Sequence, residues 1–142
     1  LLPAHIALRV ETSESEPVGA ELAHMDQVVM NLVLNARDAM PGGGKLDVTV
    51  HSRLVSEAEA LSRPPLRPGA TVELVVRDSG IGMTRAVSER AFEPFFTTKD
   101  PGLGTGLGLA IVSRIVDGYG GRITIRSSVN EGTAITVWLP CR

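Results

Sequence analysis

The sequence is short of cysteine, of aromatic residues and of any long apolar run. Its 142 residues include one cysteine, Cys141, which excludes an intrachain disulfide framework and fits a reducing compartment. No apolar run approaches the roughly 20 residues of a membrane-spanning helix, and the first residues do not resemble a signal peptide. Neither charge dominates, because 14 basic and 16 acidic residues leave a net charge of −2. This balance predicts neither nucleic acid nor an anionic membrane as the main partner.

Apolar residues make up 43% of the chain, enough for one core, and we expect a single domain over residues 1–142. Alternating and helical patterns of apolar residues predict the elements. The expected strands are 5–10, 45–55, 70–78, 122–129 and 133–139, and the expected helices are 21–40, 84–91 and 107–119. Residues 56–69 are rich in proline and predict a connection or a hairpin excursion. This order predicts an α+β two-layer sandwich, with three main helices on one face of a mixed, mostly antiparallel sheet of about five strands.

A polar stripe follows the first predicted helix. Asn31, Asn35 and Asp38 are spaced i, i+4 and i+7, so they share one helix face beside the apolar one. Asparagine is a poor interior helix residue, and its amide oxygen is a ligand that Mg²⁺ accepts beside phosphates and waters. The stripe therefore indicates a binding role, and a plain solvated helix face is the alternative.

A first glycine motif, "VVRDSGIGM", follows an apolar strand. Asp78 ends the strand, and Gly80 and Gly82 permit a tight bend just beyond it. A carboxylate at that position can accept a hydrogen bond from an exocyclic amine, which selects adenine over guanine. A common Asp-Ser-Gly turn is the alternative.

A second glycine motif, "KDPGLGTGLGL", runs from Lys99 to Leu109 and leads into a helix. It fits neither the P-loop pattern nor G-x-G-x-x-G, and no strand leads directly into it. We expect a segment that folds over a triphosphate as a lid, with free amides at Gly106 to Leu109. An unstructured surface loop is the alternative. The preceding "FEPFFTTK" argues against that alternative, because three phenylalanines are poor residues to leave in water: Phe92, Phe95 and Phe96.

Four stretches in this order resemble the ATP-binding catalytic domain of two-component sensor histidine kinases. "QVVMNLVLNARDAM" is similar to the asparagine box of that family, "DSGIGM" to the first glycine box, "FEPFFTTK" to the phenylalanine box and "GTGLGLAIV" to the second glycine box. "GYGGRITIRSSVNEGTAITVWLP" resembles the closing hairpin. The resemblance covers nearly the whole chain and implies the Bergerat-type ATP fold shared with gyrase, heat-shock chaperone and mismatch-repair ATPases.

The resemblance also implies ATP and Mg²⁺ as cofactors and assigns roles to single residues. Asn35 would coordinate Mg²⁺, Asp78 would bind the adenine amine, and Thr133 would support Asp78 through water. The expected catalytic residues are Asn31, Asn35 and Lys99. The expected nucleotide-binding residues are Asn35, Asp38, Asp78, Gly80, Gly82, Lys99, Gly104, Thr105, Gly106, Leu107, Gly108 and Thr133.

Asn31 bears on the reaction. Gyrase-like and chaperone members of the superfamily carry a glutamate at this position, as a general base for water. An amide cannot take a proton from water at neutral pH, so Asn31 favours phosphoryl transfer to a protein side chain. The resemblance implies that the acceptor is a histidine on a separate dimerisation hairpin, with relay to a response-regulator aspartate. The histidines of this chain lack the context of that acceptor: His5, His24 and His51.

Two other functions stay open at this point. One is an ATPase-driven conformational switch of the gyrase or chaperone type, and the other is a nucleotide-sensing module without catalysis. For the favoured kinase, the expected partners are ATP or ADP, the histidine-bearing hairpin and the receiver domain of a response regulator, without nucleic acid. We expect the isolated domain to be a cytoplasmic monomer, with the membrane attachment of its parent protein left open.

Overall fold

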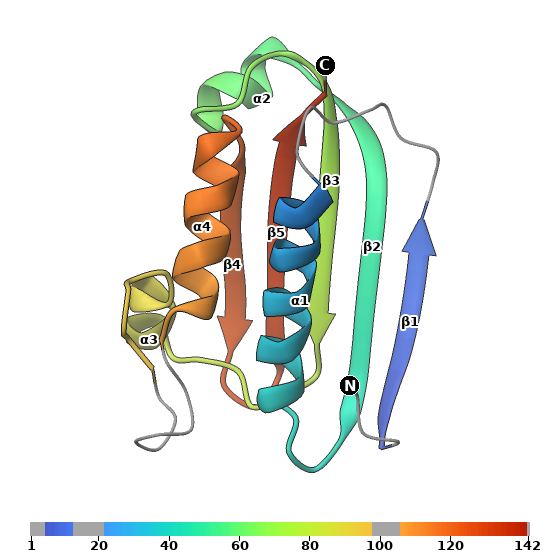
Figure 1. Ribbon diagram of the computed structural model, residues 1–142, viewed down its shortest axis with the longest axis vertical. Helices are drawn as coiled ribbons and strands as arrows, with labels where there is room; N and C mark the ends of the chain where they lie inside the picture. The colour runs from blue at the N-terminus through green and yellow to red at the C-terminus, as the bar shows by residue number, and fades with distance from the viewer. Residues whose placement is uncertain (1–4, 13–21, 98–105, 142) are drawn as a thin grey trace.

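One five-stranded sheet forms the base of the molecule (Figure 1). The computed structural model of this chain describes residues 5–12, 22–97 and 106–141. The strands lie in the order β1-β2-β3-β5-β4, with β1 parallel to β2 and the other neighbours antiparallel. They are β1 (Ile6–Thr12), β2 (Gly44–Val55), β3 (Gly69–Asp78), β4 (Arg122–Ser128) and β5 (Gly132–Pro140). The prediction of a mixed, mostly antiparallel sheet is confirmed.

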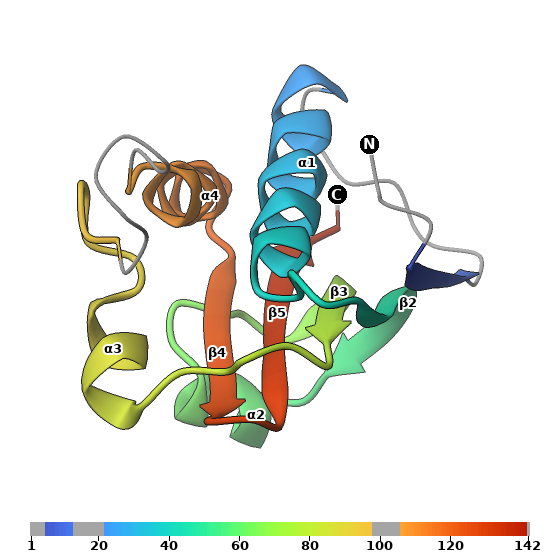
Figure 2. The ribbon, with the colours of Figure 1, turned by 90° about the horizontal axis from the view of Figure 1, so that it is seen from below.

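The two longer helices lie side by side over the same face of this sheet (Figures 1 and 2). The helices are α1 (Leu22–Asp38), α2 (Glu57–Ser62), α3 (Arg85–Arg90) and α4 (Gly108–Gly118). The short α3 packs near β4, and α2 lies at the opposite end of the sheet (Figure 1). The three predicted helices are therefore present within a few residues of their expected ends.

The core lies between the sheet and the pair formed by α1 and α4. Val28, Leu32 and Ala36 repeat at i, i+4 and i+8 on α1 and are almost fully buried. Alternate residues of the central strands meet them, so one face of each strand is apolar. These buried strand residues are Leu46, Val48, Leu74, Val76, Ile135 and Val137. Burial of a side chain of this kind contributes about 1.5–3 kcal/mol, so the core fixes how α1 and α4 sit on the sheet.

The segment 56–69 contains a helix that the sequence reasoning missed. Ser56 is the N-cap of α2, and its Oγ accepts a hydrogen bond from the backbone N–H of Glu59 at 3.1 Å. The S-x-x-E spacing of these two residues is a helix-start signal. The prediction rested on the prolines of this segment alone, and these follow the helix without preventing its first turns.

The expectation that all three phenylalanines avoid water is wrong for Phe95, which is 75% exposed. Its φ of 67° and a 2.8 Å hydrogen bond from its backbone N–H to the Gly106 carbonyl fix the backbone in a conformation that leaves the ring exposed. Phe96 behaves as expected, because its ring is half-buried and packs 4.3 Å from the Arg90 guanidinium.

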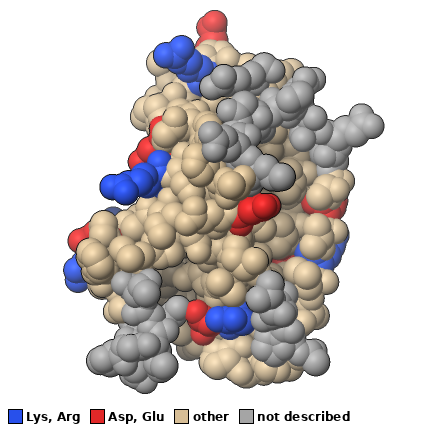
Figure 3. Space-filling view, viewed as in Figure 1, with Lys and Arg blue, Asp and Glu red and all other residues tan. Residues whose placement is uncertain are grey.

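Charged side chains of both signs are scattered over the face that carries α1 and α4, without a large patch of one sign (Figure 3). Across the described ranges, no helix combines the length and the apolar character needed to cross a bilayer.

Candidate nucleotide-binding site

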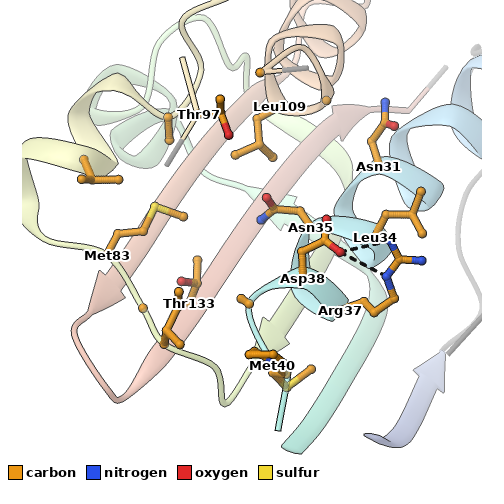
Figure 4. Close-up of a pocket in the computed structure, with 18 of the residues that line it drawn as sticks. Asn31, Leu34, Asn35, Arg37, Asp38, Met40, Met83, Thr97, Leu109 and Thr133 are labelled. Atoms are coloured by element: carbon orange, nitrogen blue, oxygen red, sulfur yellow. Dashed lines mark hydrogen bonds and ion pairs between the residues drawn. The ribbon is translucent and has the colours of Figure 1, made fainter. Parts of the chain in front are cut away.

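A cavity of about 950 Å³ opens between the second half of α1, the loop after β3, α3 and the start of α4. Its volume is in the range of cavities that hold small-molecule ligands and cofactors. Asn35 and Asp38 reach into it from α1, and Met83 and Thr133 lie on the opposite side (Figure 4). The structure thus brings together seven of the predicted residues, which all line this cavity: Asn31, Asn35, Asp38, Gly82, Gly106, Gly108 and Thr133.

The polar stripe of α1 forms one wall of the cavity. Asn31 and Asn35 are half-buried, one helical turn apart. Asp38 is held by Arg37, whose Nε and Nη2 donate to its Oδ1 at 3.2 and 3.0 Å. The Nδ2 of Asn31 is buried and has no hydrogen-bond partner in the described part of the chain. A buried amide without a partner is costly in a finished fold, and this one lies on the wall of a cavity.

The first glycine motif brings the loop after β3 onto two other elements. A Cβ on Gly80 would lie 2.3 Å from the Ala39 carbonyl oxygen, and the next residue, Ile81, donates its N–H to that same oxygen at 2.9 Å. Gly82 has a φ of +68°, and a Cβ there would lie 1.9 Å from the Ser128 carbonyl oxygen. Only glycine allows both approaches, so the motif closes the cavity floor between α1 and the β4–β5 hairpin.

Asp78 lies beneath this floor, as the last residue of β3. Its side chain is buried, and its Oδ1 accepts the Gly80 N–H at 2.9 Å. Burial raises the pKa of the Asp78 carboxyl above 3.8, and hydrogen bonds from the backbone N–H groups of Gly80 and Thr133 oppose that rise. Asp78 does not line the large cavity but borders a second hollow of about 200 Å³. Its neighbour on β5, Thr133, lines the large cavity.

The start of α4 forms the wall opposite α1. The N-cap residue of α4, Leu107, makes no capping hydrogen bond with its side chain, although Ser56 caps α2 and Thr84 caps α3. The first N–H groups of a helix have no intrahelical partner, and together with the helix dipole they attract an anion. Gly108, the first residue of α4, lines the cavity, and a Cβ there would have no atom within 4 Å. Packing therefore does not require glycine at position 108, but a ligand that approaches the backbone closely would.

Some predicted site residues are not in this cavity. Gly80 and Leu107 are described but do not line it. Each of them is next in sequence to a residue of the cavity wall. The predictions for Lys99, Gly104 and Thr105 lie outside the described residues.

Several contributors were missed by the sequence reasoning. Apolar side chains complete the walls of the cavity, and the i+3 spacing from Asn31 on α1 was the signal available for one of them, Leu34. These missed residues are Leu34, Met40, Ile81, Met83 and Leu109. Ser127, which borders the smaller hollow, was also missed, because a serine in a predicted strand carries no signal until its partners are known.

The fold and the cavity define a class, an α/β sandwich whose binding site combines an amide-bearing helix wall with an uncapped helix N-terminus. A family model described as "Histidine kinase-, DNA gyrase B-, and HSP90-like ATPase" matches residues 20–142. The chain therefore belongs to this family.

Named relatives agree with the histidine kinase branch of the family. The chain is 43% identical over 124 residues to the sensor kinase CckA of Brucella abortus, across 87% of this chain and 13% of that protein. It is 38% identical over 136 residues to the sensor histidine kinase ZraS of Escherichia coli K12, across 95% of this chain and 26% of that protein. The chain thus spans only 13% and 26% of the length of these two relatives.

Solved structures show the same likeness. The catalytic domain of histidine kinase ThkA aligns with a TM-score of 0.74 and 31% identity, over 96% of this chain and 79% of that one. The mycobacterial sensor histidine kinase MprB aligns with a TM-score of 0.74 and 29% identity, over 98% of this chain and 84% of that one. The predicted family and fold class are confirmed.

Proposed function

We propose that this domain binds Mg²⁺-ATP and transfers the γ-phosphoryl group to a histidine on a separate dimerisation hairpin of its parent protein, for relay to a response regulator. The observation that carries the proposal is the pairing of the Asn31–Asn35 wall with the uncapped start of α4 across one cavity. The relatives are sensor kinases, which supports transfer of the phosphoryl group to a protein side chain rather than to water. The proposed location is cytoplasmic, and the isolated domain is proposed to be a monomer.

Mg²⁺ fits the donor set on α1. The described residues contain no cluster of three His, Cys, Asp or Glu side chains, which a metal site built wholly from such residues would use. Mg²⁺ at nucleotide sites takes one or two protein oxygens and completes its shell with phosphates and waters. Asn35 would supply the amide oxygen, with Asp38 beside it on the same helix wall. When bound, the ion would neutralise charge on the phosphate oxygens.

The residues of this chain would act mainly by positioning. Phosphoryl transfer needs an aligned donor and acceptor and little covalent chemistry from the protein. The amides at the start of α4 would hold the phosphate chain, while Thr133 and the buried Asp78 would hold the purine end. Lys99 is proposed as a further phosphate ligand, together with Gly104 and Thr105, which lie outside the described residues.

The amide at Asn31 argues against the gyrase-type alternative. Hydrolysis by members of that type uses a carboxylate to accept a proton from the attacking water, and Asn31 has no acceptor site of that basicity. Its Nδ2, which has no hydrogen-bond partner among the described residues, can act only as a donor. The acceptor imidazole would bring its own proton acceptor, if one is needed, from the hairpin side.

The test mixes the domain, Mg²⁺ and γ-labelled ATP with the histidine-bearing hairpin of the parent protein. We expect acid-labile phosphohistidine on the hairpin and little ATP turnover by the domain alone. Tight ADP binding without any phosphohistidine would contradict the kinase proposal. Fast hydrolysis that ignores the hairpin would favour the conformational ATPase instead.

A further inference from the structure

A hydroxyl pair lies beneath the purine end of the cavity. Ser127, in β4, is half-buried, and its Oγ lies 2.7 Å from the Thr133 Oγ1. The same Oγ accepts the Met83 N–H at 2.8 Å and lies 3.0 Å from the Gly132 carbonyl oxygen. Ser127 therefore joins the first glycine loop to both residues that begin β5.

The directions of these hydrogen bonds follow from counting protons. A serine hydroxyl has one proton to donate and two lone pairs to accept with. The Met83 N–H can only donate and the Gly132 carbonyl can only accept, so Ser127 gives its proton to Gly132. Thr133 must then donate its own proton to Ser127. This is the one arrangement in which all three contacts are hydrogen bonds, and it leaves Thr133 Oγ1 with lone pairs alone toward the cavity.

Four backbone donors around this hydroxyl are occupied as well. The N–H of Gly80 is bonded to Asp78, and that of Ile81 is bonded to Ala39. The Met83 N–H is held by Ser127, and the Thr133 N–H is held by the Asp78 carboxylate. These four amides cannot turn to a ligand without breaking a bond. At Thr133 itself the floor consequently presents acceptors, which are the hydroxyl oxygen of Thr133 and, behind it, the Asp78 carboxylate.

We propose that Ser127 is a positioning residue, which holds Thr133 as a hydrogen-bond acceptor and thereby makes the site select a 6-aminopurine over a 6-oxopurine. The inference rests on the proposed function, because it places the purine of the nucleotide over Thr133. An amino group offers two protons to this floor. A carbonyl oxygen at the same position of the purine would meet lone pairs instead, and buried acceptors that face each other are left unpaired.

The experiment compares the dissociation constants of ADP and IDP by isothermal titration, since the two nucleotides differ in the amino or oxo group at purine position 6 and the attendant proton at N1. The variants are Ser127→Ala, Ser127→Thr, which keeps the hydroxyl, and the neighbouring exposed Ser128→Ala as a matched control. Wild type should bind ADP at least about tenfold more tightly than IDP. Ser127→Ala frees the Thr133 proton to point into the cavity, so ADP should weaken by about two- to tenfold while IDP weakens less or improves. The ratio of the IDP dissociation constant to the ADP dissociation constant should return toward the wild-type value in Ser127→Thr and keep the wild-type value in Ser128→Ala.

The ratio distinguishes positioning from a structural role. If Ser127→Ala weakens ADP and IDP by the same factor, Ser127 only supports the fold and the inference is overturned, while the proposed nucleotide site stands. If wild type binds neither nucleotide, the proposed function fails with it. If thermal unfolding shows that Ser127→Ala does not fold, Thr133→Val serves as the second variant, because it removes the acceptor directly. In Thr133→Val the ratio of the IDP to the ADP dissociation constant must fall. An unchanged ratio in Thr133→Val also overturns the inference.

Discussion

Replacing Asp78 by asparagine should make the domain more stable at neutral pH and a poorer nucleotide binder. The carboxylate is 5% exposed, and it is supported by the backbone N–H groups of Gly80 and Thr133. Asparagine keeps an oxygen that can accept the Gly80 N–H, but it removes the buried charge. The substitution therefore separates the electrostatic cost of Asp78 to the fold from its proposed value to the site.

The sign of the stability effect follows from the pKa. Burial raises the pKa of Asp78 in the folded state above 3.8, so the folded protein binds this proton more readily than the unfolded chain does. The resulting stabilisation is fully present below pH 3.8 and is lost as the pH rises through the folded pKa. Each pH unit between the two pKa values corresponds to about 1.4 kcal/mol. Urea unfolding of Asp78→Asn should thus give a higher free energy of unfolding than wild type at pH 7, and a much smaller difference at pH 3.

The effect on binding has the opposite sign. A hydrogen bond to a charged group contributes roughly 1.5–3 kcal/mol, so ADP should bind Asp78→Asn about ten- to 150-fold more weakly by isothermal titration. Asp26→Asn is the matched control, because Asp26 is exposed on α1 and its replacement should leave both measurements near wild type. A variant that is less stable than wild type at pH 7, or that binds ADP equally well, would refute this account of Asp78.

Three further substitutions test other parts of the molecule. Gly108→Ala should raise the free energy of unfolding by up to about 1 kcal/mol and weaken the binding of Mg²⁺-ADP. Gly118→Ala, at the other end of α4, should change the free energy of unfolding but not the binding of Mg²⁺-ADP. If both variants bind Mg²⁺-ADP equally well, Gly108 is not part of the site. Asn35→Ala should lower the rate of phosphotransfer to the hairpin at least about tenfold more than it lowers the affinity for ADP. The reason is that the proposed metal contact matters most as charge develops in the transition state. An unchanged rate of transfer would contradict the assignment of Asn35 as a metal ligand. Trp138→Phe removes the 2.9 Å hydrogen bond from Trp138 Nε1 to Glu73. It should lower the free energy of unfolding, measured in urea, by about 1–2 kcal/mol while the affinity for ADP stays unchanged. A loss of ADP binding would show that this end of the sheet is coupled to the cavity.

The strands and long helices could be predicted because their periods reflect burial directly. Val28, Leu32 and Ala36 repeat with the helical period and are buried on α1, and Leu46 and Val48 alternate toward the same core. The helix α2 was missed because a two-turn element has too few residues to show a period. Its only signal was the capping pair that begins at Ser56.

The site could be predicted as a set of residues but not as an arrangement. Spacing on one helix placed Asn31 and Asn35 on a shared wall, because both positions lie within one rigid element. The depth of Asp78 depends on how the glycine loop packs against α1 and β5, which are distant in sequence. The same is true of Ser127, whose partners come from two other segments, the loop after β3 and the start of β5. The exposure of Phe95 was mispredicted because its backbone conformation, rather than its hydrophobicity, sets the direction of the ring.

The central claim is that Asn35, Thr133 and the start of α4 surround one adenine nucleotide. It is tested most directly by amide chemical-shift mapping of the ¹⁵N-labelled domain during titration with Mg²⁺-ADP. The account predicts that the largest shifts fall in the second half of α1, at Gly82, at Thr133 and at Gly108, with little change in β1 and around Trp138. No shifts at all, or shifts centred on the smaller hollow beside Arg77 and not on these residues, would contradict it.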